Sequence, residues 1–394
     1  MTRHSHLMIA GAVLLCGAPL LAQLNAPEIS YDSTPNLLKL PDRLYLGEAV
    51  GVATNSRGHI FVYTRTGGSF GTEGTSRTFE VGGSRLFEFD QNGAFVREIG
   101  HNLYGFTFAH TVRVDPQDNI WVVDEGSNMI IKFNPEGRVV MTMGRKAEDI
   151  RIPMPQPPAA APSAGGRGGA GAEAGGGPGA GGGRGGAGAE TAGGGRGGAG
   201  AGAPVGAGAQ TDVFNRPTDV AWDASGNIFI SDGYGNSRVA KFDRNGVFIK
   251  SWGSRGTAPG QFNTPHSIAT DAPGNVYVGD RGNRRIQVFD NNGEFKTQYI
   301  NVGAPWAVCI SPGAHQYLFS SNSNGTADMD NGEIYKMELD GRILGKFGKA
   351  GKLLKEFGSV HEIDCRNPDE LYVGEITNWR VQKLILHKLQ AEAR

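Results

Sequence analysis

The stretch from residue 215 to residue 289 contains one sequence pattern twice. Residues 215–253 read NRPTDVAWDASGNIFISDGYGNSRVAKFDRNGVFIKSWG, and residues 265–289 read PHSIATDAPGNVYVGDRGNRRIQVF. In each copy an alternating apolar segment leads to a turn with Gly-Asn, and a second alternating segment ends in Asp. A polar loop and a third apolar segment follow. A close internal repeat of short predicted strands indicates a β-propeller.

Four further copies align with these two, which gives six repeats. The first predicted strands begin at Val50, His110, Thr218, His266, Trp306 and His361. The second predicted strands end 14 residues later, at Thr64, Asp124, Asp232, Asp280, Ser320 and Glu375. Asn-Gly or Asp-Gly turns, which supply the positive φ of tight hairpins, follow the third strands of repeats 1, 3, 4 and 5. The sequence therefore predicts an all-β fold, a six-bladed β-propeller of four-stranded antiparallel blades.

The last repeat lacks a recognisable fourth strand. No Asn-Gly turn follows its third strand in RVQKLILHKL, residues 380–389. An open propeller would leave a long unpaired strand edge. We therefore expect the apolar segment Leu37–Leu40 to supply the missing strand and close the ring.

The chain divides into four segments that form one propeller domain. Residues 1–22 have the features of a signal peptide, since Arg3 and His4 precede the apolar run LMIAGAVLLCGAPLLA. Residues 23–156 are assigned to blades 1 and 2 with the closing segment, and residues 211–394 to blades 3–6. Residues 157–210 are almost only Gly and Ala and are expected to be a disordered surface insert. The insert could be a tether or partner-binding arm, or it could be a neutral expansion without a function, and the sequence leaves both interpretations open.

The composition and the cysteines bear on the cellular compartment and on the class of binding partner. The chain has 394 residues with 38 basic and 39 acidic side chains, so no charge excess favours nucleic acid. We expect an exported monomer, periplasmic or extracellular, without a membrane span. Cys16 leaves a lipoprotein signal open, although Leu15 is large for the position before a lipidated cysteine. Cys309 and Cys365 could pair in an oxidising compartment, but nothing in the sequence requires it.

Histidine occupies the opening position of the first strand in repeats 2, 4 and 6 only. The first strand of a propeller blade lines the central channel, and alternate blades of six are related by about a third of a turn. His110, His266 and His361 should therefore converge at one depth. A single His usually packs or faces solvent, but three in one column suit a catalytic Zn²⁺ with an open fourth position. Copper, iron and cobalt remain alternatives.

The residues that follow the second strands should share the mouth of the channel with the three histidines. They include Arg65 in repeat 1, Tyr234 in repeat 3 and Arg281 in repeat 4. Arginine binds a carboxylate in a bidentate manner, and cations near a tyrosine favour its ionised form, a base. A single Arg at this position would be interpreted as an ordinary surface residue. Two arginines and a tyrosine together indicate a site for an anionic substrate. The acidic residues that end the second strands are expected to cap loops.

The stretches FNRPTDVAWDASGNIFISDGYGNSR, GQFNTPHSIA and GDRGNRRIQVF resemble the peptidyl-α-hydroxyglycine α-amidating lyase family. They also resemble, more loosely, the wider NHL-repeat propellers. The likeness to the lyases covers nearly all of residues 45–385 apart from the Gly/Ala insert. It implies a zinc-dependent enzyme that cleaves the C–N bond of a peptidyl- or N-acyl-α-hydroxyglycine to an amide and glyoxylate.

The resemblance also implies roles for individual residues. His110 in FAHTV, His266 in TPHSI and His361 in SVHEI match the zinc ligands. Tyr234 in DGYGNSR matches the catalytic tyrosine, and Arg65 and Arg281 match the arginines that bind the substrate's carboxylate. The family also holds a structural Ca²⁺ through an acid after the last His and two backbone carbonyls. Here these positions are Glu362, where the family has Asp, and Val52 and Val112.

The chain departs from the family at two positions near the site. Ser359 stands where the family has a Met before the last zinc ligand, and Gly235 stands where the family has a disulfide cysteine. The alternative function is a non-catalytic NHL-type propeller that binds a protein or ligand around a structural metal. A structural zinc would need a fourth protein ligand, which the His column lacks. A propeller lactonase would use Ca²⁺ with carboxylate and Asn ligands, unlike three histidines.

Overall fold

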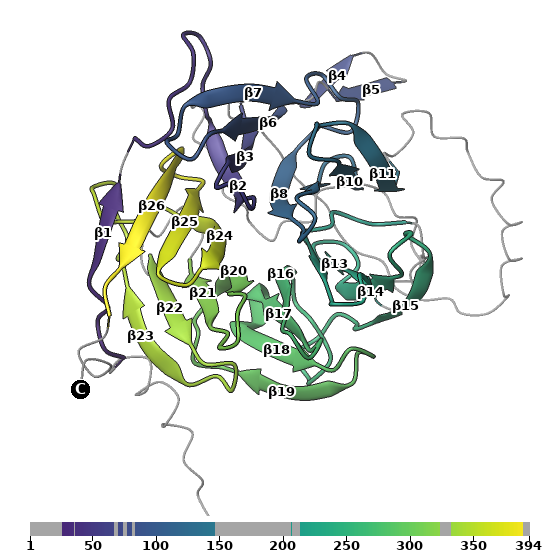
Figure 1. The fold of residues 1–394 in the computed structure, drawn as a ribbon. Helices are drawn as coiled ribbons and strands as arrows, with labels where there is room; N and C mark the ends of the chain where they lie inside the picture. The colour runs from purple at the N-terminus through teal and green to yellow at the C-terminus, as the bar shows by residue number, and fades with distance from the viewer. Residues whose placement is uncertain are drawn as a thin grey trace, which may run out of the picture.

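The molecule is a ring of six small sheets around a central channel (Figure 1). The computed structural model describes residues 26–34, 36–66, 70–73, 77–80, 83–145, 206, 213–323 and 332–388. The predicted signal peptide and nearly all of the Gly/Ala insert lie outside these residues. Each sheet has four antiparallel strands, so the prediction of a six-bladed β-propeller is confirmed. Within the described residues no helix has the length and apolar character needed to cross a membrane.

Each blade is a meander whose first strand lies nearest the channel. Blade 1 comprises β2 (Glu48–Thr54), β3 (Ile60–Arg65), β6 (Ser84–Phe89) and β7 (Phe95–Ile99), with a hairpin of β4 (Phe70–Glu73) and β5 (Arg77–Glu80) inserted after β3. Blade 2 comprises β8 (Ala109–Val114), β9 (Ile120–Asp124), β10 (Met129–Phe133) and β11 (Val139–Gly144). Blade 3 comprises β12 (Asp219–Trp222), β13 (Ile228–Asp232), β14 (Arg238–Phe242) and β15 (Phe248–Trp252).

The second half of the ring repeats this order. Blade 4 comprises β16 (Pro265–Thr270), β17 (Val276–Asp280), β18 (Arg285–Phe289) and β19 (Phe295–Tyr299), with the short 3₁₀ helix η2 (Arg281–Asn283) after β17. Blade 5 comprises β20 (Pro305–Ile310), β21 (Leu318–Asn322), β22 (Glu333–Met337) and β23 (Ile343–Phe347). Blade 6 comprises β24 (Val360–Asn367), β25 (Glu370–Glu375), β26 (Arg380–Leu386) and β1 (Tyr31–Thr34).

The predicted register agrees closely with these bounds. The second strands end at Asp124, Asp232, Asp280 and Glu375 as predicted. In blade 1 the strand continues to Arg65 and in blade 5 to Asn322, so these two strands are longer than expected. The alternation of apolar residues therefore identified which side chains face the neighbouring blades, because a slip by one residue would reverse every face.

The predicted closing segment was wrong. β1, not Leu37–Leu40, pairs antiparallel with β26, from Tyr31 opposite Leu386 to Thr34 opposite Lys383. Tyr31 packs its ring against Phe347 and Phe357, at centroid distances of 5.3 and 6.4 Å, and its hydroxyl donates to the Lys355 carbonyl. The leucines of residues 37–40 pack instead against a cluster of blade 1 and blade 6 residues. Blade 6 thus combines β1 from the N-terminal part of the chain with β24–β26 from the C-terminal part, and their pairing closes the ring.

Buried carboxylates at the ends of second strands hold the loops at the mouth of the channel. Asp232 accepts from the backbone N–H of Asn215 at 2.8 Å and from Arg238 Nε at 2.9 Å. Asp280 repeats the arrangement in blade 4 with Asn263 and Arg285. The prediction that these residues cap loops is confirmed, and the pairing with an arginine fixes the loops that carry Tyr234 and Arg281.

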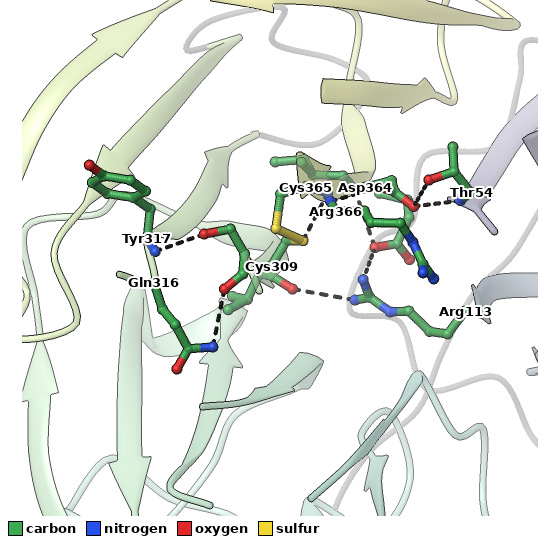
Figure 2. Close-up of a disulfide and its surroundings, with 12 residues drawn as sticks. Thr54, Arg113, Cys309, Gln316, Tyr317, Asp364, Cys365 and Arg366 are labelled. Carbon is green, nitrogen blue, oxygen red and sulfur yellow. Dashed lines mark hydrogen bonds and ion pairs between the residues drawn. A yellow bond between two sulfur atoms is a disulfide. The ribbon is translucent and has the colours of Figure 1, made fainter. Parts of the chain in front are cut away.

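A disulfide joins the inner strands of blades 5 and 6. Cys309 of β20 and Cys365 of β24 are bonded, with their Cα atoms 6.1 Å apart (Figure 2). The sequence had left this pairing open. Both cysteines are buried, so the bond lies inside the molecule.

Candidate active site

Three histidines from alternate blades meet at one end of the channel. His110 lies on β8, His266 on β16 and His361 on β24, and none is more than 2% exposed. Their ring centroids are 4.6–4.9 Å apart. One ring nitrogen from each lies within 4.8 Å of the others. Each histidine sits at the start of an inner strand, so the six-fold repeat of the backbone brings them together.

Hydrogen bonds orient two of the imidazoles. His266 Nδ1 lies 2.7 Å from the Trp306 carbonyl, and His361 Nδ1 lies 2.7 Å from the Val50 carbonyl. A carbonyl only accepts, so Nδ1 carries the proton in both rings and Nε2 keeps its lone pair. A backbone carbonyl that fixes the tautomer in this way is the usual partner of a metal-binding histidine.

The surroundings of His266 favour its uncharged form. Burial, followed by the Arg281 and His361 charges, lowers the pKa of His266 well below its usual value. A neutral imidazole is the form that binds a metal ion. Three buried histidines whose nitrogens converge in this way could hold a metal ion with three protein ligands.

The Tyr234 hydroxyl lies next to the histidines. It is 3.1 Å from His266 Nε2 and 3.4 Å from His110 Nε2. Its loop follows β13 and is tightly packed. A Cβ on Gly233 would come within 2.0 Å of the Pro265 carbonyl oxygen, and one on Gly235 within 2.1 Å of the Asn215 side chain. The two glycines therefore allow the tyrosine to approach the histidines.

Two arginine guanidinium groups flank the Tyr234 ring. The Arg216 group lies 4.5 Å from the ring centroid and the Arg281 group 5.3 Å from it. Arg281 also lies 4.5 Å from the centre of the Trp306 ring. The Arg216 side chain is ion-paired with Glu125, whose Oε1 lies 2.6 Å from Arg216 Nε. The Tyr234 ring thus lies against two guanidinium groups, and one of them, that of Arg216, is also paired with a carboxylate.

Arg65 lies on the blade 1 side of the same mouth. Its Nε donates to the Ala109 carbonyl at 2.8 Å, directly before His110, and its guanidinium stacks on Phe108 at 3.8 Å. Carboxylates of Glu48 and Glu125 lie 3.4 and 3.7 Å from its terminal nitrogens. The structure therefore places all three mouth residues proposed from the sequence, Arg65, Tyr234 and Arg281, around the three histidines.

Sequence reasoning did not assign a role to Arg216. It precedes Pro217 and lies outside the repeat columns, so its position in the pattern gave no signal. Its contact with Tyr234 depends on the fold of the loop before β12, where Arg216 has a positive φ of 58°. The backbone N–H of Arg216 donates to the Asn128 side chain of blade 2, which holds this conformation.

A cavity of about 370 Å³ opens beside Arg65. Tyr45, Phe108 and Trp379 contribute aromatic walls, and Arg65 and Glu48 contribute charged atoms. Trp379 is 61% exposed, so the cavity is open to solvent. A cavity with aromatic walls and one guanidinium suits an apolar group that is attached to an anion.

The acidic residue expected to bind calcium has other partners in this structure. Glu362 Oε1 is 2.9 Å from Arg113 Nη1, and its Oε2 accepts from Thr111 Oγ1. Burial raises the pKa of Glu362 to about 8 against the opposing effect of Arg113. Val52 and Val112 are buried on β2 and β8. The acidic residue expected to hold a calcium ion is thus already bonded to a guanidinium.

Comparison with known proteins finds NHL repeats in part of the chain. The NHL repeat family matches residues 214–242 and 262–289, the two copies that first revealed the pattern. Virginiamycin B lyase from Staphylococcus aureus is a solved structure with a TM-score of 0.49 and 10% identity, over 91% of this chain and all of that one.

Among curated proteins, the chain is similar to amidating enzymes. It is 24% identical over 309 residues to peptidyl-alpha-hydroxyglycine alpha-amidating lyase 1 of Drosophila melanogaster, which covers 72% of this chain and 46% of the fly protein. It is 36% identical over 179 residues to peptidyl-glycine alpha-amidating monooxygenase B of Xenopus laevis, over 43% of this chain and 20% of the frog protein. The resemblance to the lyases is therefore confirmed, and the chain spans less than half of the length of these relatives.

Proposed function

We propose that the protein is a lyase that cleaves the C–N bond of a peptidyl- or N-acyl-α-hydroxyglycine and releases an amide and glyoxylate. The observation that carries the proposal is the Tyr234 hydroxyl, which lies within 3.4 Å of two histidine Nε2 atoms and is flanked by two guanidinium groups. A base next to a cationic, metal-binding site suits abstraction of a hydroxyl proton. Similarity to the named amidating lyases supports the same reaction.

The residues around the site account for each requirement of this reaction. Zinc bound by His110, His266 and His361 would act as a Lewis acid that acidifies the substrate hydroxyl. Arg65 or Arg281 binds the carboxylate beside the carbinol carbon, since a guanidinium matches a carboxylate in geometry and charge. The substrate's acyl group then extends toward the cavity formed by Tyr45, Phe108 and Trp379.

Tyr234 both accepts and returns the proton that the reaction transfers. As a base it accepts the hydroxyl proton, the electron pair of the broken O–H bond forms the second C–O bond of the glyoxylate aldehyde, and the C–N electron pair leaves with the nitrogen. The proton held by Tyr234 is then available to the nitrogen, which yields the neutral amide. No water or redox partner is consumed.

The test is a glyoxylate assay on the full chain with its metal content measured in the same preparation. N-benzoyl-α-hydroxyglycine is a suitable substrate because its ring matches the aromatic cavity. We expect about one zinc per chain and stoichiometric release of glyoxylate and benzamide. Bound zinc without glyoxylate would contradict the proposed reaction and support a non-catalytic propeller with a metal centre.

We also propose that the protein is exported. The buried Cys309–Cys365 disulfide supports an oxidising compartment. Expression in a bacterial host with a Sec pathway, followed by N-terminal sequencing of the exported chain, should give a start directly after Ala22. Retention of residues 1–22 on a cytoplasmic product would contradict export.

A further inference from the structure

Arg113 is a largely buried cation that contacts the inner strands of other blades. It lies on β8, three residues after His110, and its side chain is 13% exposed. Its guanidinium binds Asp219 of β12 in a bidentate manner, with Nε 3.0 Å from Oδ1 and Nη2 2.6 Å from Oδ2. Burial opposes its charge, but Asp219 and Glu362 outweigh this effect and keep the pKa of the guanidinium above its usual value.

The same guanidinium reaches three further blades. Nη1 lies 2.9 Å from Glu362 Oε1 of β24, and Nη2 lies 3.4 Å from Ser267 Oγ of β16 and 3.3 Å from the Val308 carbonyl of β20. Figure 2 shows the side chain directed toward the strands that carry Cys309 and Cys365. One side chain of blade 2 therefore contacts inner strands of blades 3, 4, 5 and 6.

Asp219 extends this network. Its Oδ2 also accepts from Ser267 Oγ at 2.8 Å and from the Ile268 N–H at 3.0 Å, both on blade 4. The Val308 N–H of blade 5 donates in turn to Ser267 Oγ at 3.0 Å. Blades of a propeller share no backbone ladder, so polar groups that bridge the inner strands hold the ring together at its centre.

We propose that the Arg113 guanidinium is a built-in structural cation of the channel, and that the propeller folds and remains closed without calcium. It binds two carboxylates, a hydroxyl and a carbonyl oxygen from four blades. The resemblance to the lyases had implied that a bound Ca²⁺ would join the blades in this way. A guanidinium supplies five N–H donors in a fixed plane and cannot be removed by a chelator.

A calcium ion beside this group would be unfavourable. Calcium binds six to eight oxygen ligands, and the expected acidic ligand, Glu362, already accepts from Arg113 and Thr111. The ion would also lie next to the guanidinium charge, in a buried site where repulsion between like charges is poorly screened. The donor set therefore fits the guanidinium and does not fit calcium.

The decisive experiment measures thermal unfolding of the full chain in calcium-free buffer while CaCl₂ is added, with MgCl₂ as the control for non-specific ion effects. We expect the same Tm at every calcium concentration and no calcium in the purified protein by elemental analysis. A structural site would raise the Tm by about 5 °C or more at a hundredfold excess over its Kd. Such a saturable rise, or about one calcium per chain, would overturn the proposal. Neither readout depends on lyase activity.

Variants of Arg113 test the role of the side chain itself. Arg113→Ala leaves two buried carboxylates without their cation and should lower the Tm by at least about 5 °C. The matched control is Arg366→Ala, which removes an arginine that donates to the Val114 carbonyl in the same region. Equal Tm values for the two variants would overturn the proposal. If Arg113→Ala does not fold, Arg113→Lys should fold with an intermediate Tm, because it keeps the charge and loses the bidentate contact.

Discussion

The proposed chemistry depends on a few side chains that break the repeat. Where blades 2, 4 and 6 begin with histidine, blade 3 has Thr218, whose hydroxyl donates to the Pro265 carbonyl directly before His266. The loop that follows β13 then brings Tyr234 to the same point. The repeat supplies equivalent positions around the channel, and the substitutions at these positions supply a metal-binding set and a base.

Replacement of Tyr234 by phenylalanine tests its role as the base. Phe retains the ring that packs between Arg216 and Arg281 but removes the hydroxyl. We expect kcat for glyoxylate release to fall by at least about 100-fold, with zinc content unchanged. Tyr104→Phe, on an exposed tyrosine, is the control and should retain full activity. Full turnover by Tyr234→Phe would exclude the tyrosine as the base.

The cavity beside Arg65 leads to a prediction about the substrate's acyl group. Trp379 forms one of its aromatic walls. Trp379→Ala should raise KM for the benzoyl substrate by about three- to tenfold with little change in kcat, because the lost contact is remote from the broken bond. An N-acetyl substrate should be affected less. Leu353→Ala, which changes another exposed apolar side chain, is the control. An unchanged KM for the benzoyl substrate would place its ring elsewhere.

At the scale of single strands, alternation and turn residues were sufficient to predict the blades. The inner histidines were predicted because they occupy one column of a strict 14-residue register. The closing strand was not, because Leu37 and Leu38 are more apolar than the sequence of β1, YDST. β1 buries only one face when it pairs with β26. Its burial therefore alternates, with Tyr31 and Ser33 less exposed than Asp32 and Thr34, and a continuous apolar run is not required. Arg216 was missed for another reason, since its contact arises from a loop.

The closing strand gives a prediction about stability. Tyr31 is 7% exposed, packs against two phenylalanines and donates a hydrogen bond to the Lys355 carbonyl. Tyr31→Ala should therefore lower the free energy of unfolding by about 3 kcal/mol. The alanine variant of Leu38, which the sequence had favoured for this strand, should cost less because Leu38 is only partly buried. Chemical denaturation of both variants makes the comparison, and a larger loss for Leu38→Ala would contradict the role of β1.

At the scale of the whole molecule, several contacts join different blades near the channel. The histidines lie at the mouth, Arg113 and its carboxylates lie beyond them, and the disulfide of blades 5 and 6 lies beside Arg113 (Figure 2). Thr54 of blade 1 also donates to Asp364 of blade 6. This arrangement is what sequence reasoning could not supply, because Asp219, Ser267 and Glu362 become neighbours only after the ring closes.

The disulfide should stabilise this closed ring. Cys309 and Cys365 are separated by 56 residues, and closing a loop of this length costs the unfolded chain about 4 kcal/mol in entropy. We expect the Cys309→Ala, Cys365→Ala double variant to unfold at a Tm several degrees lower than the wild type, with glyoxylate release at 25 °C retained because neither cysteine lies at the mouth. A reductant should lower the Tm of the wild type toward that of the double variant and leave the double variant unchanged. Equal Tm values for the oxidised wild type and the double variant would show that the polar contacts around Arg113 hold blades 5 and 6 together without the disulfide.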